Sequence, residues 1–230
     1  MKKLTICFFL FLSIEGFAQE RKAYSDIVLD EIILDTQKTP EGTSDTHFSF
    51  VWWLTYEYWA SVLSRDPNLS EAMLESTLEV LDDYMILAIV QADISIFGAF
   101  NYYPKDVIDG YLKAGYQVGE KIEYISPIDD PSVEMEAILA SMAPLLRAAM
   151  GEMGANLHFY IYEDSNGSGQ RILDPYESGR LSVELSNTDE QDLVVDFISP
   201  INSLFVPRLC PNGEEAHISW NYCPWSGERL

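Results

Sequence analysis

Apolar residues follow three patterns along the chain, and each pattern predicts a different kind of element. An unbroken apolar run from Tyr84 to Val90 is typical of a central strand that is buried on both faces. Alternation over residues 157–162 predicts a half-buried strand, and residues 180–185 and 192–198 predict two more. Between Phe50 and Ser64 the aromatic and aliphatic residues recur every three or four positions, which predicts an amphipathic helix with an aromatic face.

Capping and breaking residues place the remaining elements. Asn68 with Glu71 three positions later is a capping-box pattern, so a helix is expected from there to about Asp82. A long apolar helix is expected from Ser132 to about Met150, and Pro144 should kink or split it. The shorter expected elements are a strand within 96–103, a helix at 104–113, a strand at 120–125, and either a strand or a short helix at 27–34.

This order of elements predicts the fold class. Helices dominate the first part of the chain and strands the later part, without an internal repeat. We therefore expect a single α+β domain, with an antiparallel or mixed sheet and helices packed on one face.

The first eighteen residues have the pattern of a secretory signal peptide. Lys2 and Lys3 precede a short apolar run, and Gly16-Phe17-Ala18 offers small residues for cleavage after Ala18. The run is about half of the roughly 20 residues that a membrane-spanning helix needs. We expect a secreted or periplasmic protein divided into a signal peptide (1–18), a partly disordered N-terminal segment (19–46), an α+β domain (47–206) and a cysteine-containing tail (207–230).

Charge narrows the possible partners. The 230 residues include 14 Lys and Arg against 37 Asp and Glu, a net charge of −23, while 47% of them are apolar, enough to bury a core. So acidic a surface repels nucleic acid and anionic membranes. The expected partner is an unidentified protein or small ligand, and no membrane span is expected after the signal.

The tail carries the one resemblance to a known family. Cys210-Pro211-Asn212-Gly213 and Cys223-Pro224-Trp225-Ser226-Gly227 each resemble a Cys-Pro-x-Cys-Gly knuckle of a zinc ribbon. Each knuckle keeps its first cysteine, its proline and its glycine, and neither has a second cysteine. A site with four thiolates is therefore impossible, and the resemblance covers only about 20 residues.

Two interpretations of the surviving cysteines compete. In a secreted chain Cys210 and Cys223 are expected to form a disulfide, with Trp220, Tyr222 and Trp225 as a small core of the tail. Alternatively Cys210, His217 and Cys223 bind zinc, with a carboxylate such as Glu214 as fourth ligand. We favour the disulfide because an oxidising compartment promotes it.

A second candidate metal site begins at Asp164. Asp164, Asn166 and Ser168 alternate as the first ligands of a calcium loop do, with Gly169 in sixth place and Asp174 nearby. The pattern then fails, because Pro175 stands where a bidentate Glu is required. A glycine-rich turn between strands is the alternative. No other cofactor is expected.

The candidate catalytic residues lie far apart in the sequence and belong to no recognised motif. Asp93, with Gln91 and Ser95, follows the buried run, and a desolvated carboxylate there could act as an acid or base, although it could equally cap a turn. Glu57 lies among aromatic residues that could stack on a sugar or form core. His158 lies on an expected strand, either as a base or as an ordinary hydrogen-bonded residue.

These observations favour a non-enzymatic binding or interaction domain. The chain has no nucleophile elbow, phosphate-binding loop or His-Glu-x-x-His motif. Alternatives are a secreted hydrolase in which Glu57 and Asp93 flank a sugar, and a calcium-dependent binding module.

Overall fold

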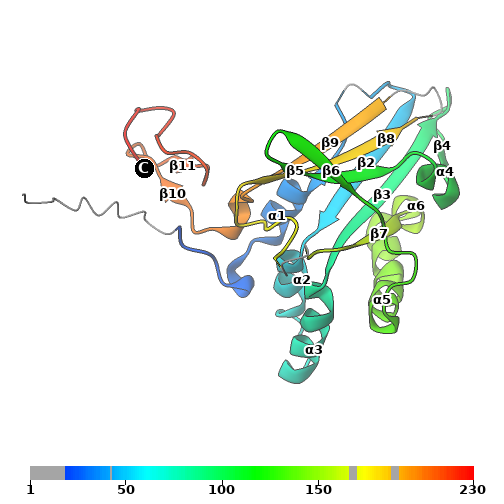
Figure 1. The fold of residues 1–230 in the computed structure, drawn as a ribbon, viewed down its shortest axis with the longest axis horizontal. Coiled ribbons are helices and arrows are strands. Elements are labelled where there is room, and N and C mark those ends of the chain that lie inside the picture. Colours follow the sequence, from blue (N-terminus) through cyan, green and yellow to red (C-terminus); the bar gives the residue numbers. More distant parts are fainter. Residues whose placement is uncertain (1–18, 42, 166–169, 188–191) are drawn as a thin grey trace, which may run out of the picture.

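The domain consists of two antiparallel sheets and a layer of helices. The computed structural model describes residues 19–41, 43–165, 170–187 and 192–230. One sheet lies in the middle of the domain, with the second sheet on one face and helices on the other (Figure 1). The predicted α+β fold with an antiparallel sheet is confirmed, and the second sheet covers the face that the helices leave open.

The central sheet is built around β3 (Tyr84–Ile94). All eight residues of β2 (His47–Leu54) pair with residues 86–93 of β3. The other edge of β3 pairs with β7 (His158–Glu163) and β4 (Phe100–Tyr102). The two-residue strand β1 (Gln37–Lys38) extends the sheet beyond β2. The long apolar run of β3 is therefore explained by burial on both faces, as its sequence predicts.

The second sheet has the order β6-β5-β8-β9. Its strands are β5 (Lys113–Val118), β6 (Lys121–Ile125), β8 (Gly179–Ser186) and β9 (Asp192–Ser199). Alternate residues of β9 face inward, where Phe197 packs against Trp53 of β2 with 6.0 Å between ring centroids. The larger core of the protein lies between these two sheets.

Helices cover the other face of the central sheet. They are α2 (Tyr56–Leu63), α3 (Glu71–Asp82), α5 (Val133–Met150) and α6 (Glu152–Ala155), while the short α4 (Lys105–Asp109) follows β4. Met135 and Met142 of α5 pack against the β2 and β3 side chains of this face. The Ser70 hydroxyl, rather than Asn68, caps α3 by accepting from the Met73 N–H at 3.3 Å, and α5 continues through Pro144.

The helix expected from Phe50 to Ser64 is wrong in its first part. Residues up to Leu54 belong to β2, and α2 starts only after Thr55, whose hydroxyl accepts from the Tyr58 N–H. Trp52 faces the helices and Trp53 faces the second sheet, as consecutive residues of a strand must. A strand that is buried on both faces does not alternate between polar and apolar residues. The spacing of the aromatic residues in β2 therefore resembles the spacing expected for a helix.

The segment before residue 47 belongs to the folded domain over the residues described. It forms the short 3₁₀ turn η1 (Tyr24–Asp26) and the helix α1 (Leu29–Thr36), and both Ile27 and Ile32 are fully buried in the core between the sheets. Of the two alternatives expected at 27–34, a strand or a short helix, the structure shows the helix α1. The predicted signal peptide, residues 1–18, lies outside the described residues.

The C-terminal tail extends away from the two sheets (Figure 1). After the 3₁₀ turn η2 (Asn202–Leu204) it forms the strand pair β10 (Arg208–Leu209) and β11 (Glu215–Ala216), and Cys210 is joined to Cys223 by a disulfide. The tail interior consists of the disulfide, Ala216 and the packed Leu230. The expected aromatic core of the tail is wrong, because Trp220, Tyr222 and Trp225 are all exposed.

The disulfide should contribute much of the stability of the folded tail. It closes a segment with a sequence separation of 13, and the chain-entropy model assigns about 3 kcal/mol to a loop of that size. We expect C210S/C223S to make the tail sensitive to protease while the sheets unfold at nearly the wild-type temperature. Intact mass after alkylation should show two more labels with reductant than without it. An equal number of labels in both samples would contradict the disulfide.

Candidate functional site: an acidic groove between two helices

A surface groove lies between α2 and α3. Its volume is about 520 Å³, and its lining includes Leu74, Leu78 and Tyr56 together with four carboxylates. The carboxylates belong to Glu71, Glu75, Glu79 and Asp82. The three glutamates are spaced by four residues, so they lie on successive turns of α3.

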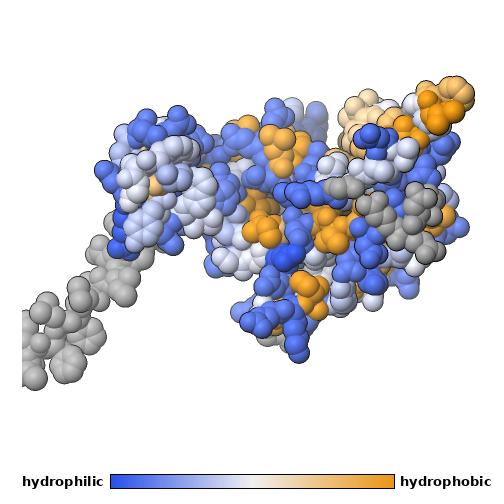
Figure 2. Space-filling view, turned by 90° about the horizontal axis from the view of Figure 1, so that it is seen from above, coloured by the Kyte–Doolittle hydropathy of each residue, from blue (hydrophilic) through white to orange (hydrophobic). Residues whose placement is uncertain are grey.

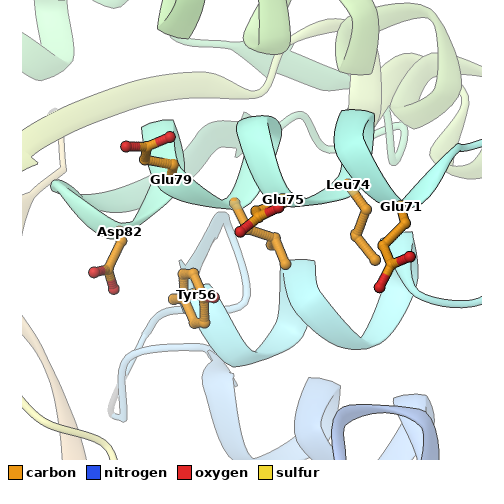
Figure 3. Close-up of a pocket in the computed structure, with 7 residues that line it drawn as sticks. Tyr56, Glu71, Leu74, Glu75, Glu79 and Asp82 are labelled. Carbon is orange, nitrogen blue, oxygen red and sulfur yellow. The ribbon is translucent and has the colours of Figure 1, made fainter.

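The side chains divide into a group that enters the groove and one that borders it. Figure 3 shows Glu71, Leu74 and Asp82 directed from α3 toward α2, whereas Glu79 points to the other side of α3. Within the described part of the chain, none of the four carboxylates forms an ion pair. The groove therefore combines an apolar floor with uncompensated negative charge.

Tyr56, the first residue of α2, lines the groove opposite α3. Burial, followed by the negative charges of Asp82 and Glu57, raises the pKa of the Tyr56 phenol above its ordinary value. The phenol therefore keeps its proton at neutral pH and can donate a hydrogen bond to a ligand. Its ring also contacts Tyr24 edge to face, with the centroids 5.9 Å apart.

Glu57, the next residue of α2, belongs to a buried ion cluster that links α2 to Arg171. Arg171 donates from Nη1 to Glu57 Oε1 at 2.7 Å and from Nε to Asp164 Oδ2 at 2.8 Å, and both acidic side chains are almost completely buried. Burial raises the pKa of Glu57 and of Asp164, although Arg171 opposes the shift. Burial alone would lower the pKa of Arg171, but the two carboxylates outweigh it and raise that pKa.

This cluster explains two of the sequence candidates. Glu57 forms an ion pair with Arg171 and does not line the groove. Asp164 is likewise held by Arg171 rather than standing free for calcium. Of the other calcium candidates, Asp174 accepts from the Tyr176 N–H at 2.8 Å, and Asn166 and Ser168 lie outside the described residues.

A second polar network connects the two sheets at the far end of β2. Asp93 Oδ1 lies 3.2 Å from His47 Nδ1, and His47 Nε2 lies 2.7 Å from Ser49 Oγ. Gln91 donates to Ser49 Oγ at 2.8 Å and to the Ser186 carbonyl at 3.2 Å. The antiparallel register creates this arrangement, because it places His47 opposite Asp93 and Ser49 opposite Gln91.

The order Asp93, His47, Ser49 matches that of a hydrolytic triad, but the exposure of its members is reversed. The Ser49 residue is 2% exposed, whereas 36% of the Asp93 side chain is exposed. A nucleophile must reach its substrate, while the orienting carboxylate is normally the buried member. The arrangement therefore fits a network that fixes strand register and satisfies buried polar groups, rather than a hydrolytic site.

The structure does not bring Glu57 and Asp93 together. Asp93 lies beside the first residue of β2, and Glu57 follows the last, so the eight residues of β2 separate them by roughly 20 Å or more. The antiparallel arrangement is the cause, since the carboxyl ends of β2 and β3 lie at opposite edges of the sheet. Two carboxylates that act on one glycosidic bond lie about 5–10 Å apart.

The remaining candidate residues, His158, Ser95 and the possible zinc ligands, form structural contacts. His158 Nε2 hydrogen-bonds to the Tyr103 carbonyl at 3.1 Å, and Ser95 Oγ accepts from the Ala99 N–H. The possible zinc ligands do not converge, because Cys210 and Cys223 are joined to each other and His217 hydrogen-bonds to Ser219. Over the described ranges, no group of three or more His, Cys, Asp or Glu residues is placed to hold a metal ion.

The sequence patterns missed the groove and most partners in the polar networks. The spacing of the α3 glutamates is visible in the sequence, but no local pattern shows that Tyr56 of α2 lies opposite them. In the part of the chain that the structure describes, no helix has the length and apolar character needed to cross a membrane.

No protein-family model, no curated protein and no solved structure matches this chain.

Proposed function

We propose that this chain is an exported, non-enzymatic binding domain, and that its groove between α2 and α3 holds a basic segment of a partner protein. The groove carries the proposal, because it joins an apolar floor to carboxylates without cationic partners among the described residues. A helical segment with leucine-like residues on one face and lysines or arginines beside them would satisfy both features. The predicted signal peptide and the disulfide support a location outside the cytoplasm.

The size of the groove limits what it can hold. A volume of about 520 Å³ suits a few side chains rather than a whole folded domain. Because the carboxylates are near the surface, their attraction is screened by salt over about 8 Å at physiological ionic strength. We therefore expect moderate affinity that falls as salt is added, with the apolar contacts accounting for the part that remains.

Binding of a labelled 14-residue helical peptide made of leucine and lysine tests the proposal. Fluorescence anisotropy should show saturable binding to the wild type, and E71Q/E75Q/D82N should weaken it by roughly 10- to 100-fold, since each lost pair contributes on the order of 1 kcal/mol near water. These substitutions preserve side-chain shape and remove only charge. A peptide with glutamate in place of lysine should not bind.

A variant with the same change in net charge provides the control. D130N/E134Q/E136Q removes three exposed carboxylates at and before the start of α5, outside the groove lining. Its affinity for the leucine and lysine peptide should stay within about twofold of the wild type, because these carboxylates do not line the groove and salt screens exposed charges beyond about 8 Å. Equal weakening by the two triple variants, or no binding by the wild type, would overturn the proposal.

A further inference from the structure

The turn between β3 and β4 exposes two large apolar side chains at its corners. Ile96 is 92% exposed and Phe97 is 90% exposed. The Gly98 N–H donates to the Ser95 carbonyl at 2.8 Å, and Gly98 has φ +78°, so the three-residue loop Ile96-Phe97-Gly98 closes the hairpin. Corner positions of such turns normally carry polar residues, which makes Ile and Phe unexpected here.

Further apolar side chains support this tip from behind. Phe100 of β4 is about half exposed; its ring contacts Phe48 edge to face at 5.8 Å and stacks on Tyr102 at 5.9 Å. In Figure 2 an orange projection stands out at the upper right, at the end of the molecule where Figure 1 places β4. The tip is therefore a convex, apolar and ordered projection.

Beyond Asp93 of β3, which lies opposite Asn101, the hairpin carries no charged side chain. Residues 94–103 contain no Asp, Glu, Lys or Arg, although charged residues make up 22% of the chain. A charge in this segment would oppose transfer out of water, because desolvating an ion is costly. Its absence favours a surface that leaves water when it meets its target.

We propose that the β3–β4 tip, with Ile96 and Phe97 at its corners, inserts into the interfacial region of a lipid bilayer whose headgroups carry no net charge. The last ladder pair of the hairpin is Ile94 with Phe100, so the loop beyond it reaches roughly 7–10 Å at the rise of a strand. Interfacial segments bury their apolar face about 5–10 Å deep, which matches that length. A tip of this size attaches to a bilayer and does not cross it.

The net charge of the protein indicates which lipid headgroups the tip can approach. The net charge of −23 is repelled by anionic headgroups, so zwitterionic phospholipid is the expected surface. A second copy of the chain is a poorer occupant, since two convex tips bury far less than the roughly 1,200–2,000 Å² of a stable interface. This inference is independent of the groove, which lies between α2 and α3.

Flotation with phosphatidylcholine vesicles tests the proposal. Wild-type protein should float with the vesicles, and I96S/F97N should reduce the partition coefficient by roughly 100-fold, about tenfold for each apolar side chain. Serine and asparagine suit the corners of this turn, so the hairpin should still form. The control L34Q/L145Q removes two other exposed leucines, 76% and 69% exposed, and should float as the wild type does.

A tryptophan at the tip gives a second readout. In F97W, phosphatidylcholine should shift the emission to shorter wavelength, and adding phosphatidylglycerol should weaken the shift at low salt. The proposal is overturned if wild type stays in solution, if I96S/F97N floats unchanged, if anionic vesicles bind more strongly, or if the control loses binding equally. A dimer that forms without lipid and is lost in I96S/F97N would also overturn it, and would assign the tip to a second copy.

Discussion

Replacing Arg171 with methionine should lower the free energy of unfolding by about 3–5 kcal/mol at pH 7. The substitution keeps an apolar stem in place but leaves the carboxylates of Glu57 and Asp164 buried without their counter-ion. Removing one member of a buried ion cluster is costly because the remaining charge is neither hydrated nor paired. Urea unfolding, followed by tryptophan fluorescence, measures the difference.

The loss in R171M should shrink as the pH falls. Burial already raises the pKa of Glu57 and Asp164 in the wild type, and removing Arg171 takes away the attraction that opposes this shift. A carboxyl with a folded pKa above its unfolded value stabilises the fold when protonated, and that stability is lost as pH rises through the folded pKa. The deficit should therefore be smaller at pH 5 than at pH 7.

The matched control is Arg180→Met, which breaks an exposed pair with Asp196. The two side chains are 41% and 31% exposed, so the expected loss is at most about 1 kcal/mol. Burial would raise the pKa of Asp196, but hydrogen bonds from Arg180 and Ser182 outweigh it and lower that pKa. Any loss in R180M should thus disappear only below the ordinary carboxyl range, as pH falls through the folded pKa of Asp196.

Two outcomes would contradict the role assigned to Arg171. One is a loss in R171M no larger than that in R180M. The other is a deficit that does not change between pH 7 and pH 5. A partial recovery in E57Q/R171M would identify the unpaired Glu57 carboxylate as a source of the loss, since this variant removes one of the two buried charges.

Local patterns were sufficient for the elements with one exposed side or a clear cap. The alternation in β9 and the capping pattern before α3 predict both elements within about two residues of their observed bounds. The unbroken run of β3 was also interpretable, because a strand of a central sheet is apolar on both faces. β2 has the same character, but only Thr55 separates its end from the start of α2, so the apolar pattern continues across the boundary and does not reveal it.

The sites depended on contacts that no local pattern encodes. Glu57 and Arg171 are separated by 114 residues, and His47 meets Gln91 and Asp93 only through the register of β2 on β3. Asp93 lies near the carboxyl end of β3, and in parallel sheets polar residues at such ends commonly line a site. In this antiparallel sheet the same end lies beside the start of β2, so Asp93 meets His47 rather than Glu57.

The strand assignment of Trp52 and Trp53 leads to the second large expected effect. Trp53→Ala should lower the free energy of unfolding by about 3–5 kcal/mol, because it removes a nearly fully buried indole from the core between the sheets. Trp52→Ala should cost a similar amount by opening the core under the helices, where Trp52 contacts Tyr58 at 5.1 Å. Loss of stability alone therefore does not separate the two faces.

A double-mutant cycle with Phe197 of β9 does separate them. Trp53→Leu and Phe197→Leu should couple by about 0.5–1.5 kcal/mol, because the two rings meet edge to face at 6.0 Å. Trp52→Leu and Phe197→Leu should be additive within about 0.5 kcal/mol, because their side chains lie in the two different cores, on opposite faces of the central sheet. Urea unfolding of the single and double variants measures both cycles. Coupling of Trp52 rather than Trp53 to Phe197 would reverse the faces of β2 and contradict the arrangement of the three layers.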